Sequence, residues 1–301
     1  MKNCNIGGQA LIEGIFMRYK DDIAIAVRKP DNEIIIKKEE IKQSEFIKTL
    51  KKIPVMRGVV SFCESLSIGY RALEYSAGFI EDDDLKSDKS DNKGEKKENG
   101  TNGIFMAFTM LLSIALAISI FIILPYILAG ILRKSGITRA GIAIAEGIIR
   151  IAVFFAYMIL VSLAKDIKRV FMYHGAEHKC INCIENELEL NVDNVMKSSR
   201  FHKRCGTGFL FYIIIISVIL FMFIKADTVL LRILVRLLLV PLIAGLSYEL
   251  LKLTGKTDNA FIRALTKPAL FFQRFTTREP SSDMVEVAIS AVKALSIEEV
   301  L

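Results

Sequence analysis

Histidine is scarce in this chain of 301 residues: the sequence has three, and two of them, His174 and His178, lie four residues apart. Cysteine is also scarce and odd in number, with five residues, which does not indicate a framework of paired disulfides. The first residues, MKNCNIGGQALIEG, lack the basic start and apolar core of a secretory signal peptide. We therefore expect reduced thiols that face the cytosol.

The sequence also lacks the glycine patterns of nucleotide-binding loops. Residues 7–14 read GGQALIEG, which matches neither G-x-x-x-x-G-K nor G-x-G-x-x-G, so a turn is the simpler interpretation. Glu13 would still reach a site if this segment folded against the histidines. Base-stacking aromatic and basic patterns are missing, so we expect no nucleic-acid partner despite a net charge of +7. The charge flanks apolar runs, which favours contact with anionic lipid of the inner leaflet.

Long apolar runs fill the middle of the chain, and 52% of all residues are hydrophobic. Crossing a bilayer takes about 20 residues in a helix. Stretches of suitable length and composition are 104–132, 141–164, 207–224 and 229–251. The sequence therefore predicts an α-helical polytopic membrane protein with about four transmembrane helices. Lysine and arginine are concentrated on one side of these spans, which predicts a cell-membrane protein with both termini and the 165–206 loop in the cytoplasm.

The remaining segments predict the rest of the organisation. Residues 1–80 indicate a small α+β N-terminal cytoplasmic domain, because residues 22–38 alternate in hydropathy around a KPDN turn and Pro54 precedes a helical pattern. Residues 81–103 are highly charged and poor in apolar residues, which predicts a disordered linker between this domain and the 104–251 transmembrane domain. Residues 252–301 are expected to form a cytoplasmic amphipathic helical tail. That tail would lie on the inner leaflet or pack against the cytoplasmic domain.

The clearest chemical motif is HGAEH at residues 174–178. It has the order H-x-x-E-H, and four-residue spacing on a helix places both imidazoles on one face, where they can share a metal ion. Glu177 would then act as the catalytic general base toward a water that the metal activates. Against this interpretation, the pattern is short, and Gly175 disfavours a regular helix.

Other candidate ligands lie nearby in the same loop. Cys180-x-x-Cys183 and His202-x-x-Cys205 have spacings close to a zinc ribbon, which would be a closed, structural site. An open site would instead use His174 and His178 with His202 or a carboxylate, and Glu249 at the cytoplasmic end of the fourth span is a candidate. The cofactor in either case is a divalent metal, with zinc preferred. Hydrogen bonding to carboxylates would explain the histidines without any metal, and pairing with a basic residue would explain Glu249.

Four further charges fall inside the predicted spans. They are Glu146, Arg150, Arg232 and Arg236. Charges at this depth are costly and are usually paired or functional. Structural ion pairs between the spans are the simpler interpretation, and a transport path is the alternative.

Four long stretches together resemble a known family. They read NIGGQALIEGIFMR near the start, RVFMYHGAEHKCINCIE and RFHKRCGTGFL around the candidate ligands, and QRFTTREP near the end. In these stretches the chain is similar to the YqhQ-like bacterial membrane proteins, a family of unknown function that carries the label of a metal-dependent enzyme. The resemblance covers nearly the whole chain except residues 81–103. It implies that His174, Glu177, His178, His202 and Cys205 belong to the characteristic motifs, whereas Cys180 and Cys183 do not.

Three functions follow as hypotheses. The first is a membrane-bound, metal-dependent hydrolase whose site lies at the cytoplasmic face, with a peptide or a lipid headgroup as substrate. The second is a non-enzymatic accessory or scaffold protein that binds a membrane protein partner, in which any metal is structural. The third is a small transporter that depends on the charges within the spans.

Overall fold

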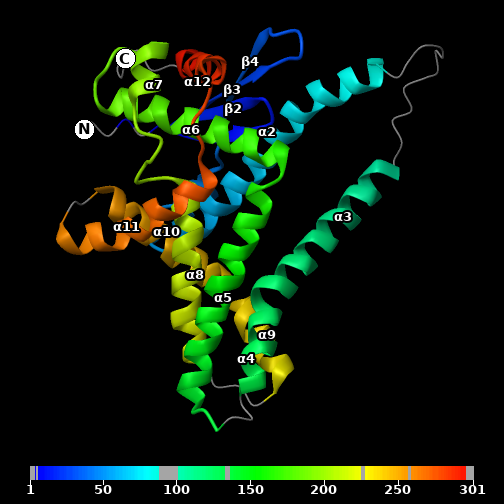
Figure 1. Cartoon of the computed structure of the whole chain (residues 1–301), viewed down its shortest axis with the longest axis vertical. Coiled ribbons are helices and arrows are strands. Elements are labelled where there is room, and N and C mark those ends of the chain that lie inside the picture. Colours follow the sequence, from blue (N-terminus) through cyan, green and yellow to red (C-terminus); the bar gives the residue numbers. More distant parts are fainter. Residues whose placement is uncertain are drawn as a thin grey trace. The chain divides into compact units, whose positions relative to one another are not determined.

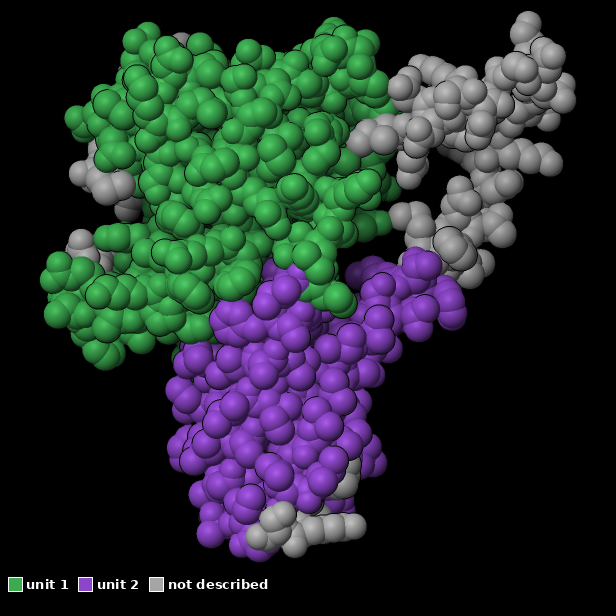
Figure 2. Space-filling model, viewed as in Figure 1, with its two compact units in different colours: residues 1–88, 160–212, 244–301 green, residues 89–159, 213–243 purple. Residues whose placement is uncertain are grey.

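The computed structural model describes residues 4, 6–87, 101–132, 136–224, 228–256 and 259–295. The chain divides into two compact units, which Figure 2 shows in different colours. Unit 1 comprises residues 1–88, 160–212 and 244–301, and unit 2 comprises residues 89–159 and 213–243. Unit 1 is therefore assembled from three separate parts of the sequence.

Unit 1 contains a four-stranded antiparallel sheet in the order β1-β2-β3-β4. Its strands are β1 Ile6–Leu11, β2 Gly14–Tyr19, β3 Asp22–Arg28 and β4 Ile34–Glu40. Strands β3 and β4 confirm the two strands predicted around the KPDN turn. The glycine-rich start, in contrast, forms a strand before it turns. Only Ile12 and Glu13 connect β1 to β2, and Glu13 has a positive φ of 51°.

Helices cover both faces of this sheet (Figure 1). Helix α2, Met56–Ser87, packs on one face, where Ile23, Ile25 and Val27 of β3 meet Ile68 and Ala72. Helices α6, Lys165–Glu185, and α12, Ser282–Ala294, pack on the other. The β3 residues on that second face are alanines, and their small side chains allow α12 to lie close to the strand.

Three shorter or peripheral helices also lie in unit 1. They are α1 Glu45–Leu50, α7 Val192–Lys197 and α11 Ala260–Thr276. The predicted amphipathic tail thus becomes α11 and α12, and the two behave differently. Helix α12 lies in the core, as the packing alternative predicts. Helix α11 buries one face around Phe272 and exposes Phe261 and Phe271 on the other.

The apolar stretches are helical. They form α3 Thr101–Ile118, a π-helical turn η1 Ser119–Ile123, α4 Leu124–Ile131, α5 Arg139–Ser162, α8 Gly206–Met222, α9 Val229–Leu238 and α10 Val240–Lys256. Within the described ranges, three helical segments are long and apolar enough to cross a membrane: Phe108–Ile131, Ala140–Ser162 and Leu230–Gly255. Helix α8 is also apolar, but its 17 residues make it shorter than these three segments, and it is not counted among them.

The domain boundaries differ from those expected from the sequence. Residues 1–80 do not close a core alone, because the sheet face that carries Ile15 and Met17 is covered by α6 and α12, which come from much later in the chain. Part of the predicted 81–103 linker is helical: residues 81–87 complete α2 and residues 101–103 begin α3. The rest of that prediction, residues 88–100, lies outside the described residues.

Unit 2 holds the charges predicted within the spans. Glu146 accepts a hydrogen bond of 2.8 Å from Arg150, one turn along the same helix α5, and another of 2.8 Å from Arg236 of α9. Arg150 also donates to the Phe121 carbonyl, and the Arg232 guanidinium lies over the Tyr126 ring. The structure thus shows the ion pairing that was the simpler of the two interpretations.

Candidate metal centre

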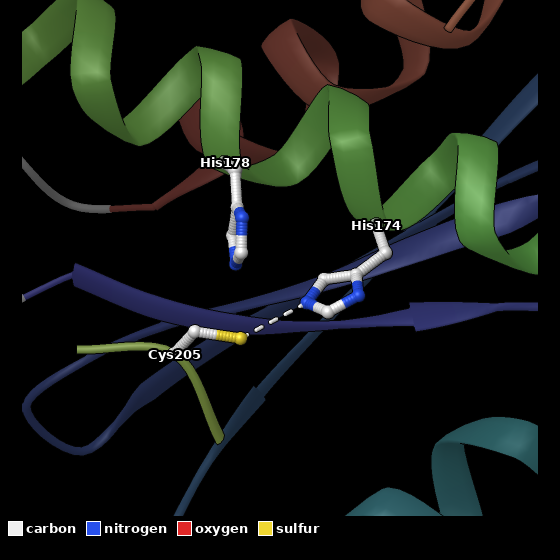
Figure 3. Close-up of side chains that lie close together, drawn as sticks. All are labelled: His174, His178 and Cys205. Carbon is white, nitrogen blue, oxygen red and sulfur yellow. Dashed lines mark hydrogen bonds between the residues drawn. The ribbon is translucent and has the colours of Figure 1, made fainter. Parts of the chain in front are cut away.

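Helix α6 presents His174 and His178 on one face, with their ring centroids 4.4 Å apart (Figure 3). The Nδ1 atom of His174 lies 2.7 Å from the Thr276 carbonyl oxygen, and Nδ1 of His178 lies 2.6 Å from that of Arg200. Because a carbonyl oxygen only accepts, both Nδ1 atoms carry the proton and donate it. Each imidazole is therefore held in one orientation, with Nε2 left as the nitrogen that can bind a metal.

Gly175 allows this arrangement rather than interrupting the helix. Helix α6 is continuous across it, contrary to the expectation that a glycine here disfavours regular helix. A Cβ at Gly175 would collide with the carbonyl oxygen of Arg278. The Thr276–Arg278 segment can therefore approach α6 closely, and this approach brings the Thr276 carbonyl to His174.

Cys205 completes a group of three. It lies on the loop that precedes α8, and its Sγ is 3.2 Å from Nε2 of His174. One ligand atom from each of His174, His178 and Cys205 lies within 4.8 Å of the other two. Thr207 fixes the sulfur, because its backbone N–H donates to Sγ at 3.3 Å and its hydroxyl lies 3.0 Å away. Two imidazole nitrogens and one sulfur are a donor set typical of zinc sites.

The electrostatics of the group favour a deprotonated thiol. Burial opposes a charge on Cys205, yet His178 and His174 hold the pKa of this thiol well below its ordinary value. Burial likewise opposes a charge on His174, yet the neighbouring Cys205 raises the pKa of His174 to about 9. The two shifts belong to one coupled pair, Cys205 and His174, in which the proton moves from the sulfur to the imidazole. A thiolate is the form in which cysteine binds a metal.

Glu177 lies between the histidine face and the core face of α6. It is 5% exposed, and burial raises the pKa of its carboxyl group, although His178 and His174 lower it in part. Its side chain packs under β1, since a Cβ placed on Gly8 would come within 3.0 Å of its Cγ. Among the described residues, no side chain or backbone group donates a hydrogen bond to this carboxylate. Glu177 is therefore available to a ligand of the site.

Two predicted ligands do not join the group. His202 faces Glu185, whose Oε2 lies 3.3 Å from its Nε2, and its backbone is held by Gln273 through two hydrogen bonds. Glu249 is paired with Arg57, which donates to both of its oxygens. For Glu249, pairing with a basic residue is the alternative that the structure supports.

The ribbon-like set of four ligands is not assembled either. Cys180 is fully buried in the core between α6 and the sheet. Cys183 donates to the carbonyl groups of Leu188 and Glu189, at 3.8 and 3.6 Å. Glu13 does fold against α6, as considered for the glycine-rich segment, but it bonds Arg169 and Tyr173 rather than a histidine.

Three contributors were missed by reasoning from the sequence. The carbonyl groups of Thr276 and Arg200 orient the histidines, and Thr207 holds Cys205. A backbone carbonyl has no residue type that could identify it. The only signal was that these residues lie in the stretches QRFTTREP and RFHKRCGTGFL, which were recognised by their resemblance alone.

Comparison with known proteins defines the family but not the activity. Residues 53–298 match the family described as protein of unknown function DUF1385. The chain is 35% identical over 295 residues to the uncharacterized protein YqhQ of Bacillus subtilis, covering 96% of this chain and 91% of that protein. No solved structure matches the chain. Neither description mentions a metal or a reaction, so the label of a metal-dependent enzyme gains no support from them. On the family match and this relative, the chain belongs to the DUF1385 family of YqhQ-like proteins.

Proposed function

We propose that this protein is a membrane-bound, metal-dependent hydrolase whose metal is held by His174, His178 and Cys205. The observation that carries the proposal is the convergence of three ligand atoms within 4.8 Å of one another, with both imidazoles oriented by backbone carbonyls. Outer hydrogen bonds of this kind fix the tautomer and direction of metal-binding histidines. Nitrogen and thiolate sulfur donors suit zinc better than magnesium or calcium, which prefer oxygen.

A three-residue donor set supports a catalytic rather than a structural role. Structural zinc sites are usually closed by four protein ligands, whereas catalytic sites keep a fourth position for water or substrate. When bound, the metal would supply an activated water and polarise the bond to be cleaved. Glu177 would accept the proton from that water, because it adjoins the ligand face and has no protein hydrogen-bond partner in the described chain.

The packing of unit 1 supports a topology with four crossings. Residues 6–87, 163–205 and 259–295 all belong to one compact unit, so these three segments would lie on the same side of a membrane. An even number of crossings must therefore separate each segment from the next. Between the first and second segments, the helices of residues 88–160 supply two crossings. Between the second and third, α9 and α10 together supply one crossing, so α8 would have to supply the other. Seventeen apolar residues are at the lower end of what spans a bilayer.

The same side is proposed to be the cytoplasm, with unit 1 at the inner leaflet. Helix α11 is suited to such a surface: Phe261 and Phe271 are exposed, and Arg263, Lys267 and Arg274 are exposed beside them. Aromatic and basic side chains together bind the interface of anionic membranes. A substrate of the hydrolase would accordingly be a polypeptide or headgroup close to the membrane surface.

The second candidate is an accessory protein in which the metal only fastens the fold. Its supporting observation is burial, since His178 and Cys205 are 1% and 5% exposed, and the group ties α6 to the loop before α8. A brace would need the ligands but not Glu177. The two candidates therefore differ in what the loss of the Glu177 carboxylate does.

The deciding experiment measures metal content and function in the same variants. Elemental mass spectrometry of the purified protein should find about one zinc per chain in the wild type and in Cys180→Ser, and much less in His174→Ala and Cys205→Ser. Glu177→Gln should keep its zinc yet fail to rescue the phenotype of a deletion strain. Full rescue by Glu177→Gln would favour the brace. Zinc lost with Cys180→Ser, or absent from all variants, would overturn the hydrolase.

A further inference from the structure

Strand β1 is an edge of the sheet, and its outer side has no strand beside it among the described residues. It pairs with β2 alone, in a register that runs from Ile6 opposite Tyr19 to Leu11 opposite Gly14. In an antiparallel pair, hydrogen-bonded and non-bonded positions alternate from the turn outward. The residues that flank a two-residue turn are bonded, so Gly8 and Ala10 direct their N–H and C=O groups away from β2. No backbone partner for these groups occurs in the described chain.

The two edges of the sheet differ in how they are protected. Strand β4, the other edge, reads IIIKKEE and carries four charged side chains. Charges on an edge strand, lysine above all, are a usual defence against pairing with another chain. Strand β1 reads IGGQAL and carries no charge at all. Gly7 even leaves open space where a side chain would be, because no atom lies within 4 Å of its ideal Cβ.

The open edge adjoins the candidate metal centre. Tyr173, Ala176 and Cys180 of α6 face the core that this helix shares with the sheet. The His174 and His178 face is turned by about 150° round the helix from that core face, and Glu177 lies between the two. Helix α6 packs under β1, and α12 under β2 and β3, so α6 is the helix next to the open edge. Glu177, whose side chain packs against Gly8, lies between the edge and the histidines.

The opposite face of the same edge carries a cavity of about 480 Å³. It lies between β1, β2 and α2 and is lined by Gly7, Gly8, Gln9, Phe16, Arg18, Lys20, Ser65 and Ile68. The only charged residues among these are Arg18 and Lys20, and both are positively charged. Arg18 already pairs with Glu64, whereas Lys20 has no carboxylate partner among the described residues. The cavity therefore suits an acidic side chain.

We propose that β1 binds an extended segment of polypeptide as a fifth strand, and that this segment is the substrate of the hydrolase. Its backbone would pair with Gly8 and Ala10, as in other cases where a peptide is added to a sheet edge. Alternate side chains of a strand point to opposite faces. One set would enter the cavity, with an acidic residue toward Lys20, while the other set would face the Glu177 side of β1.

This inference rests on the proposed function for its chemistry but not for its binding step. In the reaction, water would add across a peptide bond. Its oxygen joins the carbonyl carbon, the C–N bond breaks, and the proton that Glu177 accepts passes to the leaving amine. Binding to the edge strand needs neither the metal nor that reaction, so the two proposals can fail separately.

Photo-crosslinking of the full-length protein tests the binding step. Benzoyl-phenylalanine is placed at Gly7 or, as a matched control on the other edge, at Lys38, both in a Glu177→Gln background that spares the probe. The probe is fluorescein-labelled β-casein, an acidic unfolded polypeptide. Capture at Gly7 should exceed capture at Lys38 by at least about tenfold, the equivalent of one or two backbone hydrogen bonds. An acidic peptide should compete with the probe, and a basic one should not.

A backbone variant separates strand pairing from simple proximity. Ala10→Pro removes an outward N–H at an edge position where proline is tolerated, and should reduce capture at Gly7 about tenfold while leaving the zinc content unchanged. Ala10→Val keeps that N–H and should leave capture unchanged. Equal capture at both edges, or no effect of Ala10→Pro, would overturn the edge-strand proposal even in a protein that binds zinc. Capture at Gly7 in a protein without zinc would uphold it and remove the hydrolase instead.

Discussion

At the scale of single residues, the candidate centre depends on groups that bind no metal. The Thr276 and Arg200 carbonyls set the tautomers of two histidines, and Gly175 makes room for the first of these carbonyls. A metal centre is weakened when such outer partners are displaced, even though every ligand remains. Substitutions beside the ligands are thus the most direct test of how the centre is held.

Gly175→Ala should loosen the centre without removing a ligand. The new Cβ would meet the Arg278 carbonyl oxygen, so the segment that carries the Thr276 carbonyl must move away from α6. We expect a loss of about 1–3 kcal/mol in unfolding free energy and a fall in zinc affinity of about 10- to 100-fold. The affinity is measured by competition with a chromogenic chelator. Gly78→Ala on α2, whose Cβ would meet no atom, is the control and should leave the affinity unchanged.

Glu185 gives the protein a pH dependence of known sign. Although burial raises its pKa, hydrogen bonds and charges from His202 and Arg204 bring the pKa of this carboxyl group below its ordinary value. A lowered pKa in the folded state stabilises the protein above the unfolded pKa, and the benefit is lost as the pH falls through the folded pKa. Glu185→Gln should therefore cost about 2–3 kcal/mol at pH 7. The difference from wild type should close below about pH 4.

Chemical denaturation of both proteins across this range measures the effect. A difference that persists well below pH 4 would show that the carboxylate charge plays no part. His202→Gln provides a companion measurement. It removes one of the two partners of Glu185, so the variant should keep only part of the pH dependence that the wild type shows.

At the scale of elements, α2 and α10 are joined where their backbones come close. A Cβ on Gly58 of α2 would come within 2.7 Å of the Tyr248 Cβ, and Gly245 of α10 likewise approaches Val55. Val55 has a positive φ of 68°, which is strained for a β-branched residue. Its backbone N–H donates to Glu249 at 3.2 Å. Glu249 thus stabilises the start of α2 as well as pairing with Arg57.

Glu249→Gln should consequently weaken this junction and leave the metal in place. We expect a loss of about 1–2 kcal/mol in unfolding free energy, since a partly exposed, doubly bonded ion pair is replaced by a neutral amide. Thermal unfolding and zinc content, measured on one preparation, give both results. Loss of zinc from a folded Glu249→Gln protein would contradict this and support the original prediction that Glu249 is a metal ligand.

The sequence predicted parts of the site that depend on local spacing and missed those that depend on the fold. The H-x-x-E-H spacing was sufficient to place two imidazoles on one helical face, because that geometry is fixed within five residues. His202 and Glu249 were misplaced because their partners, Glu185 and Arg57, become neighbours only after folding. Strand β1 was read as a turn because its glycines favour turns, and its role as an edge depends on β2 beside it.

At the scale of the whole molecule, the three-part composition of unit 1 makes a definite prediction about topology. Single cysteines at Asp31, Glu187 and Glu279, which are all exposed, should react with an impermeant maleimide from one side of the membrane. A cysteine at Ile137, in the turn before α5, should react from the other side. The exposed Cys63 is first replaced by serine. Comparison of intact cells with inverted vesicles provides the measurement.

One labelling result would contradict the topology prediction. Were α8 not to cross the membrane, Glu187 and Glu279 would react from different sides, and the compact unit that contains both could not form in a bilayer. The same labelling also reports orientation. Reaction of the three positions only in inverted vesicles would place unit 1 in the cytoplasm.

The order of synthesis gives the late position of α12 a further meaning. The first strands leave the ribosome well before the helix that covers their apolar face, which follows more than 250 residues later. At about 5–20 residues per second, β1 to β3 wait between about 15 and 60 seconds for α12. The Thr276 carbonyl that orients His174 is equally late. A chain that ends before Thr276 therefore has neither a closed core nor the carbonyl that orients His174, and it should not bind the proposed metal.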